Sequence, residues 1–437
     1  YHLFLLDLPA YALAAVLAIA LQVLINQRYL AYFGMIVYYA VTVTMASMGI
    51  DEPMLAYGTS PRFIYSAMNG FGHFLPRERW FEAYWGGAAL LLLVASLLFW
   101  ARGTNDGWRQ RLRLARHALT RPVLTAIAAG ALIFAGAGAV LFYNTHIVND
   151  YKSAYQKDAE RARYERQYKQ YARLPQPRIT DVKLDVAITP AQRSLKVKGR
   201  YLLQNKTGQA VSDIIIHQDA SATGYQARFS QPVRNGLRDN KLGFYSYKLA
   251  TPLAPGAQMA FEFDVDFVPK GILGMGQDTP VVHNGTFFNN GVLPHIGYQQ
   301  ENELSDARDR RKHDLPARER MLPRDDAGGL ANNFSGNDAD WINFDATVST
   351  SADQIAIAPG TLVKDWSSQG RHYYRYKMDQ PILNFYAFQS ARYVVKRDWW
   401  QDVGIEIYYH PGHEYNLERM DKGIKESLDY YTRNFGP

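Results

Sequence analysis

The sequence predicts a multi-domain protein in which a transmembrane α-helical region is followed by a mostly-β domain, an antiparallel saddle or sandwich. Three observations predict this class. Four apolar runs of membrane length lie in the first third of the chain. A charged segment without Gly or Pro follows them. From Ile179 onward, short runs alternate apolar and polar residues, and turn signals such as Pro255-Gly256 separate them, as in strands of an antiparallel sheet.

The four apolar runs cover about residues 8–25, 29–50, 83–100 and 123–143, within a membrane region at residues 1–148. The fourth run carries no charged residue, and its glycines permit close packing between helices. Buried core helices of a soluble protein are the alternative, but soluble cores rarely supply four such runs in succession. We therefore expect four transmembrane helices.

The loop between the third and fourth runs predicts the orientation. It reads RGTNDGWRQRLRLARHALTRP and holds six arginines against a single acid, Asp106. The positive-inside rule places such a loop in the cytoplasm. The protein is then a multi-pass protein of the inner (cytoplasmic) membrane, with the residues after about 144 on the extracytoplasmic, periplasmic side. Binding of nucleic acid or of anionic lipid is the alternative role of the arginines, and a role in topology is favoured.

The rest of the chain divides into three parts. Residues 149–175 are predicted to form a charged helical stalk, residues 176–402 an extracytoplasmic β-domain, and residues 403–437 the start of a catalytic-like domain. The sequence has a net charge of +7, part of which lies in the arginine loop, so no nucleic-acid partner is expected. The absence of cysteine from the chain excludes disulfides and thiolate metal sites.

Several segments in a fixed order carry a family resemblance. They are ELSDARDRRKHDLP (303–316), WINFDATVSTSADQIAIAPG (341–360), HYYRYKMDQPILNFYAFQSARYVVKRD (372–398) and ERMDKGIKESLDYYTRNFGP (418–437). Together they resemble the N-terminal β-domain and the entry into the catalytic domain of zinc aminopeptidases of the aminopeptidase-N type. In the first segment, RKHDLP replaces the family's Phe-Pro-Cys core. The resemblance implies a saddle-like β-domain.

The membrane part has a resemblance of its own. NGFGHF, the arginine loop and YNTHIVNDY follow one another, as in bacterial fusion proteins that join an ABC-type exporter permease half to an external aminopeptidase-like domain. This resemblance implies three partners: the lipid bilayer, a cytoplasmic ABC ATPase subunit, and a peptide substrate or exported cargo. Four spans are few for a complete permease, so we expect either further spans before Tyr1 or a homodimer.

The family resemblance also implies a substrate-binding residue in the β-domain. It is an acid or Gln whose side chain accepts hydrogen bonds from the α-amino group of the substrate. By its place before the Asp-Ala-Arg run, Glu303 is the best counterpart, with Glu301 and Gln300 as fallbacks. The structural alternative is that Glu303 pairs with Arg308 or Arg310 on a solvated loop.

The zinc ligands of the family are absent from this sequence. The family uses a helical His-Glu-x-x-His motif, whereas the His413-Glu414 pair here has Leu417 where the second His would stand. The preceding Pro411-Gly412 favours a turn over a helix. We therefore assign no catalytic or metal-binding residue. Zinc is expected only in a part of the protein beyond this chain, and enzymatic activity stays open.

Two functions remain open at this point. In the first, the chain is the membrane-embedded segment of an ABC-permease and zinc-aminopeptidase fusion that acts on peptides or exported cargo outside the cytoplasm. In the alternative, it is a non-catalytic permease subunit whose external β-domain binds or guides cargo. A His-Glu-x-x-His motif beyond Pro437 favours the first. Further spans before Tyr1, with an ATPase encoded alongside, favour the second.

Overall fold

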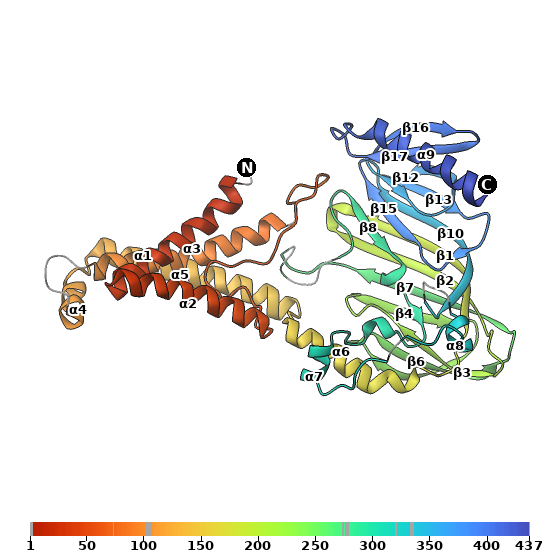
Figure 1. The fold of residues 1–437 in the computed structure, drawn as a ribbon, viewed down its shortest axis with the longest axis horizontal. Helices are drawn as coiled ribbons and strands as arrows, with labels where there is room; N and C mark the ends of the chain where they lie inside the picture. The colour runs from red at the N-terminus through yellow and green to blue at the C-terminus, as the bar shows by residue number, and fades with distance from the viewer. Residues whose placement is uncertain are drawn as a thin grey trace.

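The protein consists of a helical bundle joined to a β-rich domain (Figure 1). The computed structural model describes residues 3–72, 74–100, 107–272, 275, 279–319, 321–332 and 336–436. The bundle, coloured red to yellow in Figure 1, extends away from the β-domain, coloured green to blue. The predicted order, with the helical region first and the sheet domain after it, is confirmed.

Four long helices form the bundle: α1 (Leu8–Ile25), α2 (Arg28–Ser47), α3 (Phe74–Phe99) and α5 (Arg121–Phe142). All four are long and apolar enough to cross a membrane. Short π-helical segments precede α1 and follow α5. α3 packs closely on α5 because a glycine lies at the contact: a Cβ on Gly87 would lie 2.6 Å from the backbone nitrogen of Phe134. α1 packs on α3, and α2 packs on α1.

α3 starts earlier than the predicted residue 83 and includes charged residues that the apolar run excludes. A folded loop before the helix satisfies these charges. Arg77 donates to the carbonyls of Pro61 and Arg62, each at 2.9 Å, and Ser60 lies 2.9 Å from the carboxylate of Glu78. Tertiary hydrogen bonds therefore allow this helix to begin with residues that composition alone assigns to a loop.

The arginine loop contains a short helix, α4 (Trp108–His117), at the end of the bundle opposite the β-domain (Figure 1). The sequence analysis did not predict this helix, because frequent arginines interrupt its apolar positions. Residues 101–106, which include Arg102 and Asp106, lie outside the described part of the chain.

α6 (Ala154–Tyr168) connects the bundle to the β-domain, and a 3₁₀ turn, Lys169–Tyr171, continues it. A capping box starts α6: the Ser153 hydroxyl accepts from the backbone N–H of Gln156, and the Gln156 side chain accepts from the backbone N–H of Ser153. The segment predicted as a stalk is therefore helical over most of its length.

Aromatic side chains attach α6 to the β-domain. Tyr164 and Tyr168 are buried in a cluster with Ile215, Phe244 and Tyr298. The rings of Tyr168 and Phe244 stack with their centroids 3.9 Å apart. Burying several aromatic rings in one contact makes α6 an integral part of the domain surface.

The remaining elements belong to the β-domain. They are β1 (Arg178–Thr189), β2 (Ser194–Gln204), β3 (Val211–His217), β4 (Gly224–Phe229), β5 (Val233–Asp239), β6 (Phe244–Leu253), β7 (Gln258–Phe267), β8 (Thr286–Asn289), β9 (His295–Ile296), α7 (Ala307–Lys312), α8 (Ala327–Leu330), β10 (Ala339–Ser351), β11 (Ile355–Ile357), β12 (Thr361–Ser368), β13 (Arg371–Lys377), β14 (Ile382–Leu383), β15 (Ala387–Ala391), β16 (Val394–Trp400), β17 (Val403–Tyr409) and α9 (Leu417–Phe435).

The strands form one large sheet and three smaller ones. The large sheet has the order β12-β13-β10-β1-β2-β7-β4, with β14 paired to β10. The smaller sheets have the orders β5-β6-β3-β9, β11-β15-β8 and β16-β17. Strand residues of the large sheet and of the first two smaller sheets share one buried cluster, so the domain is a sandwich with a common core.

One strand pair departs from the predicted antiparallel arrangement. β1 and β10 run parallel, with Val182 beside Phe344 and Val186 beside Val348, whereas the other described pairs are antiparallel. The long connection between these two strands contains β2 to β9, and such a crossover is what a parallel pair requires. An alternating pattern predicts strands but not their direction, so the sequence could not indicate this pair.

The last part of the described chain is a hairpin with a helix on it. β16 pairs with β17, and Leu417 of α9 packs with Ile405 and Ile407 of β17. The boundary predicted between residues 402 and 403 falls at the turn of this hairpin. Toward the end of α9, Tyr431 and Phe435 are exposed.

Candidate functional site

The three predicted substrate-binding residues lie together in one segment. Gln300 and Glu301 belong to a 3₁₀ turn, Gln300–Asn302, which lies between β9 and α7, and Glu303 follows it directly. The side chains differ in environment: Gln300 and Glu301 are exposed, whereas Glu303 is buried. The segment is held against α6, because the backbone N–H of Gln299 donates to the hydroxyl of Tyr164 at 3.0 Å.

Glu303 is bound to groups of the chain itself. Its Oε1 accepts a hydrogen bond from the hydroxyl of Tyr298 at 3.0 Å and lies 3.5 Å from the Nζ of Lys169. Lys169 also lies 3.3 Å from a carboxylate oxygen of Glu165 and 4.0 Å from one of Glu319. The ammonium of Lys169 thus occupies the position beside Glu303 that a ligand ammonium would need.

A second buried ion pair fixes the same region. Both terminal nitrogens of Arg310 donate to the carboxylate of Glu165, at 2.7 and 2.8 Å, and its remaining donors reach the carbonyls of Leu304 and Pro316. Burial raises the pKa of Glu165, but the hydrogen bonds and charges of Arg310 and Lys169 outweigh burial and lower it overall. The carboxylate is therefore ionised and fully paired.

These contacts replace the pairing expected as the structural alternative. Glu303 is buried rather than solvated, and its cationic partner is Lys169, not Arg308 or Arg310. Arg310 pairs with Glu165 of α6 instead. These partners could not be predicted, because α6 and the turn after it are far from the segment along the chain. Buried ion pairs of this kind can be recognised only in the folded structure.

Glu301 lines a cavity of about 420 Å³ between α6 and the β-domain. Such a volume lies within the range of small-ligand pockets. The lining combines cationic, acidic and neutral polar groups from segments that are distant in the sequence: Lys157, Glu160, Arg161, Tyr164, His217, Asp219, Lys241, His295, Gln299, Glu301 and Asn302. The cavity therefore offers partners for both charges of a zwitterionic ligand.

His217 is the most distinctive group of this cavity. Burial, helped by the nearby positive charge of His295, lowers the pKa of His217 to about 3, so its ring is neutral. The Nε2 of His217 lies 2.8 Å from the side-chain nitrogen of Asn302, which donates, so the proton of the neutral ring is assigned to Nδ1. In the part of the chain that the structure describes, this buried Nδ1 has no hydrogen-bond partner.

His295 lies beside His217 in the register of β9 and β3, and its pKa is shifted in the opposite direction. Its Nδ1 lies 2.9 Å from a carboxylate oxygen of Asp338. Burial lowers the pKa of His295, but the hydrogen bond and charge of Asp338 outweigh burial and raise it overall. The pKa of one of these two adjacent imidazoles is therefore lowered and that of the other is raised.

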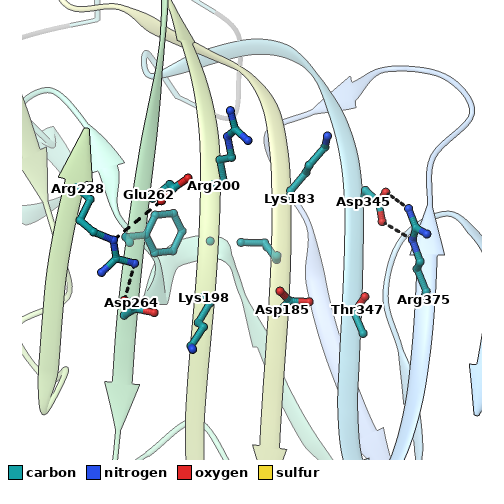
Figure 2. Close-up of a pocket in the computed structure, with 13 residues that line it drawn as sticks. Lys183, Asp185, Lys198, Arg200, Arg228, Glu262, Asp264, Asp345, Thr347 and Arg375 are labelled. Atoms are coloured by element: carbon teal, nitrogen blue, oxygen red, sulfur yellow. Dashed lines mark hydrogen bonds and ion pairs between the residues drawn. The ribbon is translucent and has the colours of Figure 1, made fainter. Parts of the chain in front are cut away.

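The outer face of the large sheet carries a second hollow, of about 580 Å³ (Figure 2). Two of its arginines are paired within the chain: Arg228 lies 2.7 Å from Asp264, and Arg375 lies 2.7 Å from Asp345. Exposed pairs of this kind contribute little to stability. Because this hollow is an open charged surface and the cavity at α6 contains buried polar groups, we place the candidate site at α6.

The described residues do not fit a zinc site. Among them no group of three or more His, Asp or Glu side chains is placed to hold a metal ion. The rings of His410 and His413 are neighbours, with their centroids 5.4 Å apart. The carboxylate of Glu414, however, accepts a hydrogen bond from the backbone N–H of Gly412. The turn predicted for Pro411-Gly412 is present.

Comparison with known proteins finds structural neighbours only. No family model and no curated protein sequence matches the chain. An M1 zinc metallopeptidase from Deinococcus radiodurans is 12% identical with a TM-score of 0.39, over 60% of this chain and 54% of that one. An aminopeptidase A from Legionella pneumophila in complex with aspartic acid is 11% identical with a TM-score of 0.40, over 62% of this chain and 28% of that one.

A two-domain M1 zinc metallopeptidase mutant bound to L-tryptophan is also similar, at 13% identity and a TM-score of 0.39. The chain spans about half the length of the first of these structures, 54%. At these scores the similarity does not establish a family, so the activity of the whole protein is a matter for proposal.

Proposed function

We propose that this chain is the membrane-anchored, peptide-recognising part of a zinc-aminopeptidase-like protein fused to an ABC-type permease. In this proposal, four membrane-spanning helices hold the β-domain outside the cytoplasm. The observation that carries the recognition role is the cavity at α6, where the accessible carboxylate of Glu301 lies with a neutral His217 and with Lys157, Arg161 and Lys241. Zinc belongs to a region of the protein beyond this chain.

The distribution of charge supports the proposed orientation. At the α4 end of the bundle, the exposed cations include Arg28, Arg109, Arg113, Arg116 and Arg121, and no acidic residue lies there in the described part of the chain. The opposite end carries acids and cations together, among them Asp51 and Glu52. This asymmetry is the one that the positive-inside rule associates with a cytoplasmic face at α4.

The cavity suits the end of a peptide. The ligand's α-ammonium pairs with Glu301, and its carbonyl or carboxylate oxygens meet Lys157 and Arg161 of α6. Glu303 has a different role in this proposal. It positions the segment through Tyr298 and Lys169, while Glu301 contacts the ligand.

A binding measurement tests the recognition role. We expect a labelled peptide with a free α-amino group to bind the full chain in detergent more tightly than its N-acetylated form, by about 10-fold to 100-fold, because one charge-assisted contact is lost on acetylation. Glu301→Gln should abolish the difference. Glu319→Gln, an exposed acid outside the cavity lining, is the matched control and should preserve it.

Two outcomes of this measurement contradict the assignment. Equal binding of the free and acetylated peptides removes peptide N-termini as the ligand. If Glu303→Gln abolishes the difference while Glu301→Gln leaves it intact, and the variant remains folded, the ammonium site is at Glu303 and the role of Glu301 is wrong.

A second function is favoured by one feature of the bundle. In the described part of the chain, α2 buries only Ala31, and its exposed side chains include Tyr32, Phe33 and Ile36. Such a helix exposes apolar surface that lipid, further helices or a second copy of the chain can cover. A permease subunit that pairs with a cytoplasmic ABC ATPase and guides cargo through its β-domain without hydrolysis fits this feature.

A further inference from the structure

One buried arginine fixes α4 across the end of the bundle. Arg111 donates to the carbonyls of Val23 at 2.5 Å, Leu24 at 3.3 Å and Phe99 at 3.0 Å. These carbonyls belong to the last turns of α1 and α3, where carbonyl oxygens lack an N–H donor within their own helix. The negative ends of two helix dipoles also favour a positive charge there. α4 therefore lies at the level where the apolar helices end.

The outer surface of α4 combines free arginines with apolar side chains. Arg109, Arg113 and Arg116 are exposed and share one stripe at helical spacing. In the described part of the chain, none of the three has a carboxylate within ion-pair distance. The adjacent stripe carries Trp108 and Leu112, which are 56% and 38% exposed.

We propose that α4 is an interfacial helix that binds the phosphate groups of anionic lipids through Arg109, Arg113 and Arg116. This proposal rests on the membrane placement of the four long helices. A cationic stripe beside an apolar stripe is the pattern of helices that lie on anionic bilayer surfaces. Guanidinium groups bind phosphate oxygens bidentately, and Arg111 is excluded because carbonyls occupy its donors.

The location of α4 favours lipid over an acidic protein surface. The ring of Trp108 stacks on that of Phe99, the last residue of α3, with centroids 5.3 Å apart. An exposed Trp at the end of an apolar helix is placed where aromatic side chains concentrate in membrane proteins, at the headgroup level. The three arginines next to it are then within reach of lipid phosphates.

A lipid titration tests this proposal. Because the chain lacks cysteine, a Gly107→Cys variant takes a polarity-sensitive fluorophore at a single position beside α4. Phosphatidylglycerol or phosphatidylcholine is titrated into the full chain in neutral detergent. We expect phosphatidylglycerol to be bound preferentially. Combined Arg109→Gln, Arg113→Gln and Arg116→Gln should weaken its binding by about 100-fold, at about five-fold for each arginine.

Two controls separate charge from damage to the fold. Replacement of the same three arginines by lysine should keep most of the preference, and Arg62→Gln, an exposed arginine at the other end of the bundle, should leave it unchanged. Raising the salt from about 0.1 M to about 1 M, which shortens the Debye length from about 10 Å to about 3 Å, should weaken the binding.

The outcomes distinguish this proposal from its premise. A triple glutamine variant that keeps the full preference for phosphatidylglycerol overturns the lipid site. Equal binding of both lipids, together with loss of a co-purifying cytoplasmic protein in that variant, overturns it in favour of a protein partner. If the chain is released from membranes by alkaline carbonate, the membrane placement itself is wrong, and the lipid site falls with it.

Discussion

Gly199→Ala is expected to destabilise the β-domain by about 3 kcal/mol, a large effect for the addition of one methyl group. Gly199 lies in the middle of β2, and a Cβ there would lie 2.1 Å from the ring of Phe263 on β7. That ring is fully buried and packs on Tyr201 with centroids 4.7 Å apart, so it has no free space to enter. Chemical denaturation of the full chain in detergent, followed by near-UV circular dichroism, measures the change.

The controls for this prediction are built on the same chain. Gly208→Ala, at an exposed position where a Cβ meets nothing within 4 Å, should change the stability by less than about 0.5 kcal/mol. Phe263→Leu combined with Gly199→Ala should recover part of the loss, because the smaller side chain makes room for the methyl group. If Gly199→Ala has the stability of the parent protein, the close approach of β2 and Phe263 is wrong.

Arg310→Ala should destabilise the β-domain by about 3–5 kcal/mol, because it leaves the carboxylate of Glu165 buried without its partner. Both side chains of this pair are nearly inaccessible, and their nitrogen and oxygen atoms lie 2.7 Å apart. The substitution also removes the hydrogen bonds that Arg310 makes to the carbonyls of Leu304 and Pro316. Denaturation midpoints of the full chain measure the loss.

Arg308→Ala is the matched control, since Arg308 is exposed on the same helix and should tolerate the change within about 0.5 kcal/mol. The double variant Glu165→Leu with Arg310→Met should be more stable than Arg310→Ala alone, because an apolar pair leaves no buried charge. Equal losses in Arg308→Ala and Arg310→Ala would contradict the assigned role of the pair in joining α6 to the β-domain.

Features that depend on the local sequence were predictable. Four long apolar runs predict four long helices, and a period of two predicts strands such as β1, in which Val182, Leu184 and Val186 are buried in turn. The early start of α3 was not predictable, because the contacts that satisfy Arg77 come from a folded loop. The parallel direction of β10 relative to β1 could not be predicted from the sequence either, because pairing direction depends on the topology of the whole sheet.

The candidate site likewise combines a segment that the local sequence indicates with partners that depend on the tertiary fold. Its segment was chosen from the residues before the Asp-Ala-Arg run, and the structure shows which of Gln300, Glu301 and Glu303 is buried. Lys169, the partner of Glu303, comes from the 3₁₀ turn after α6. His217, which lines the cavity with Glu301, comes from β3, and both are far away along the chain. No spacing in one sequence relates these segments, so only the folded structure brings them together.

Cysteine labelling tests most directly our proposal that the bundle spans a membrane with α4 inside the cell and the β-domain outside. Because the chain has no cysteine, single Gly107→Cys and Gly208→Cys variants place one thiol beside α4 and one on the β-domain, both at exposed positions. A membrane-impermeant maleimide is applied to right-side-out membrane vesicles before and after lysis. We expect the thiol at position 208 to react in intact vesicles and the thiol at position 107 to react only after lysis. Reaction at position 107 in intact vesicles contradicts the proposed orientation, whether or not position 208 reacts as well.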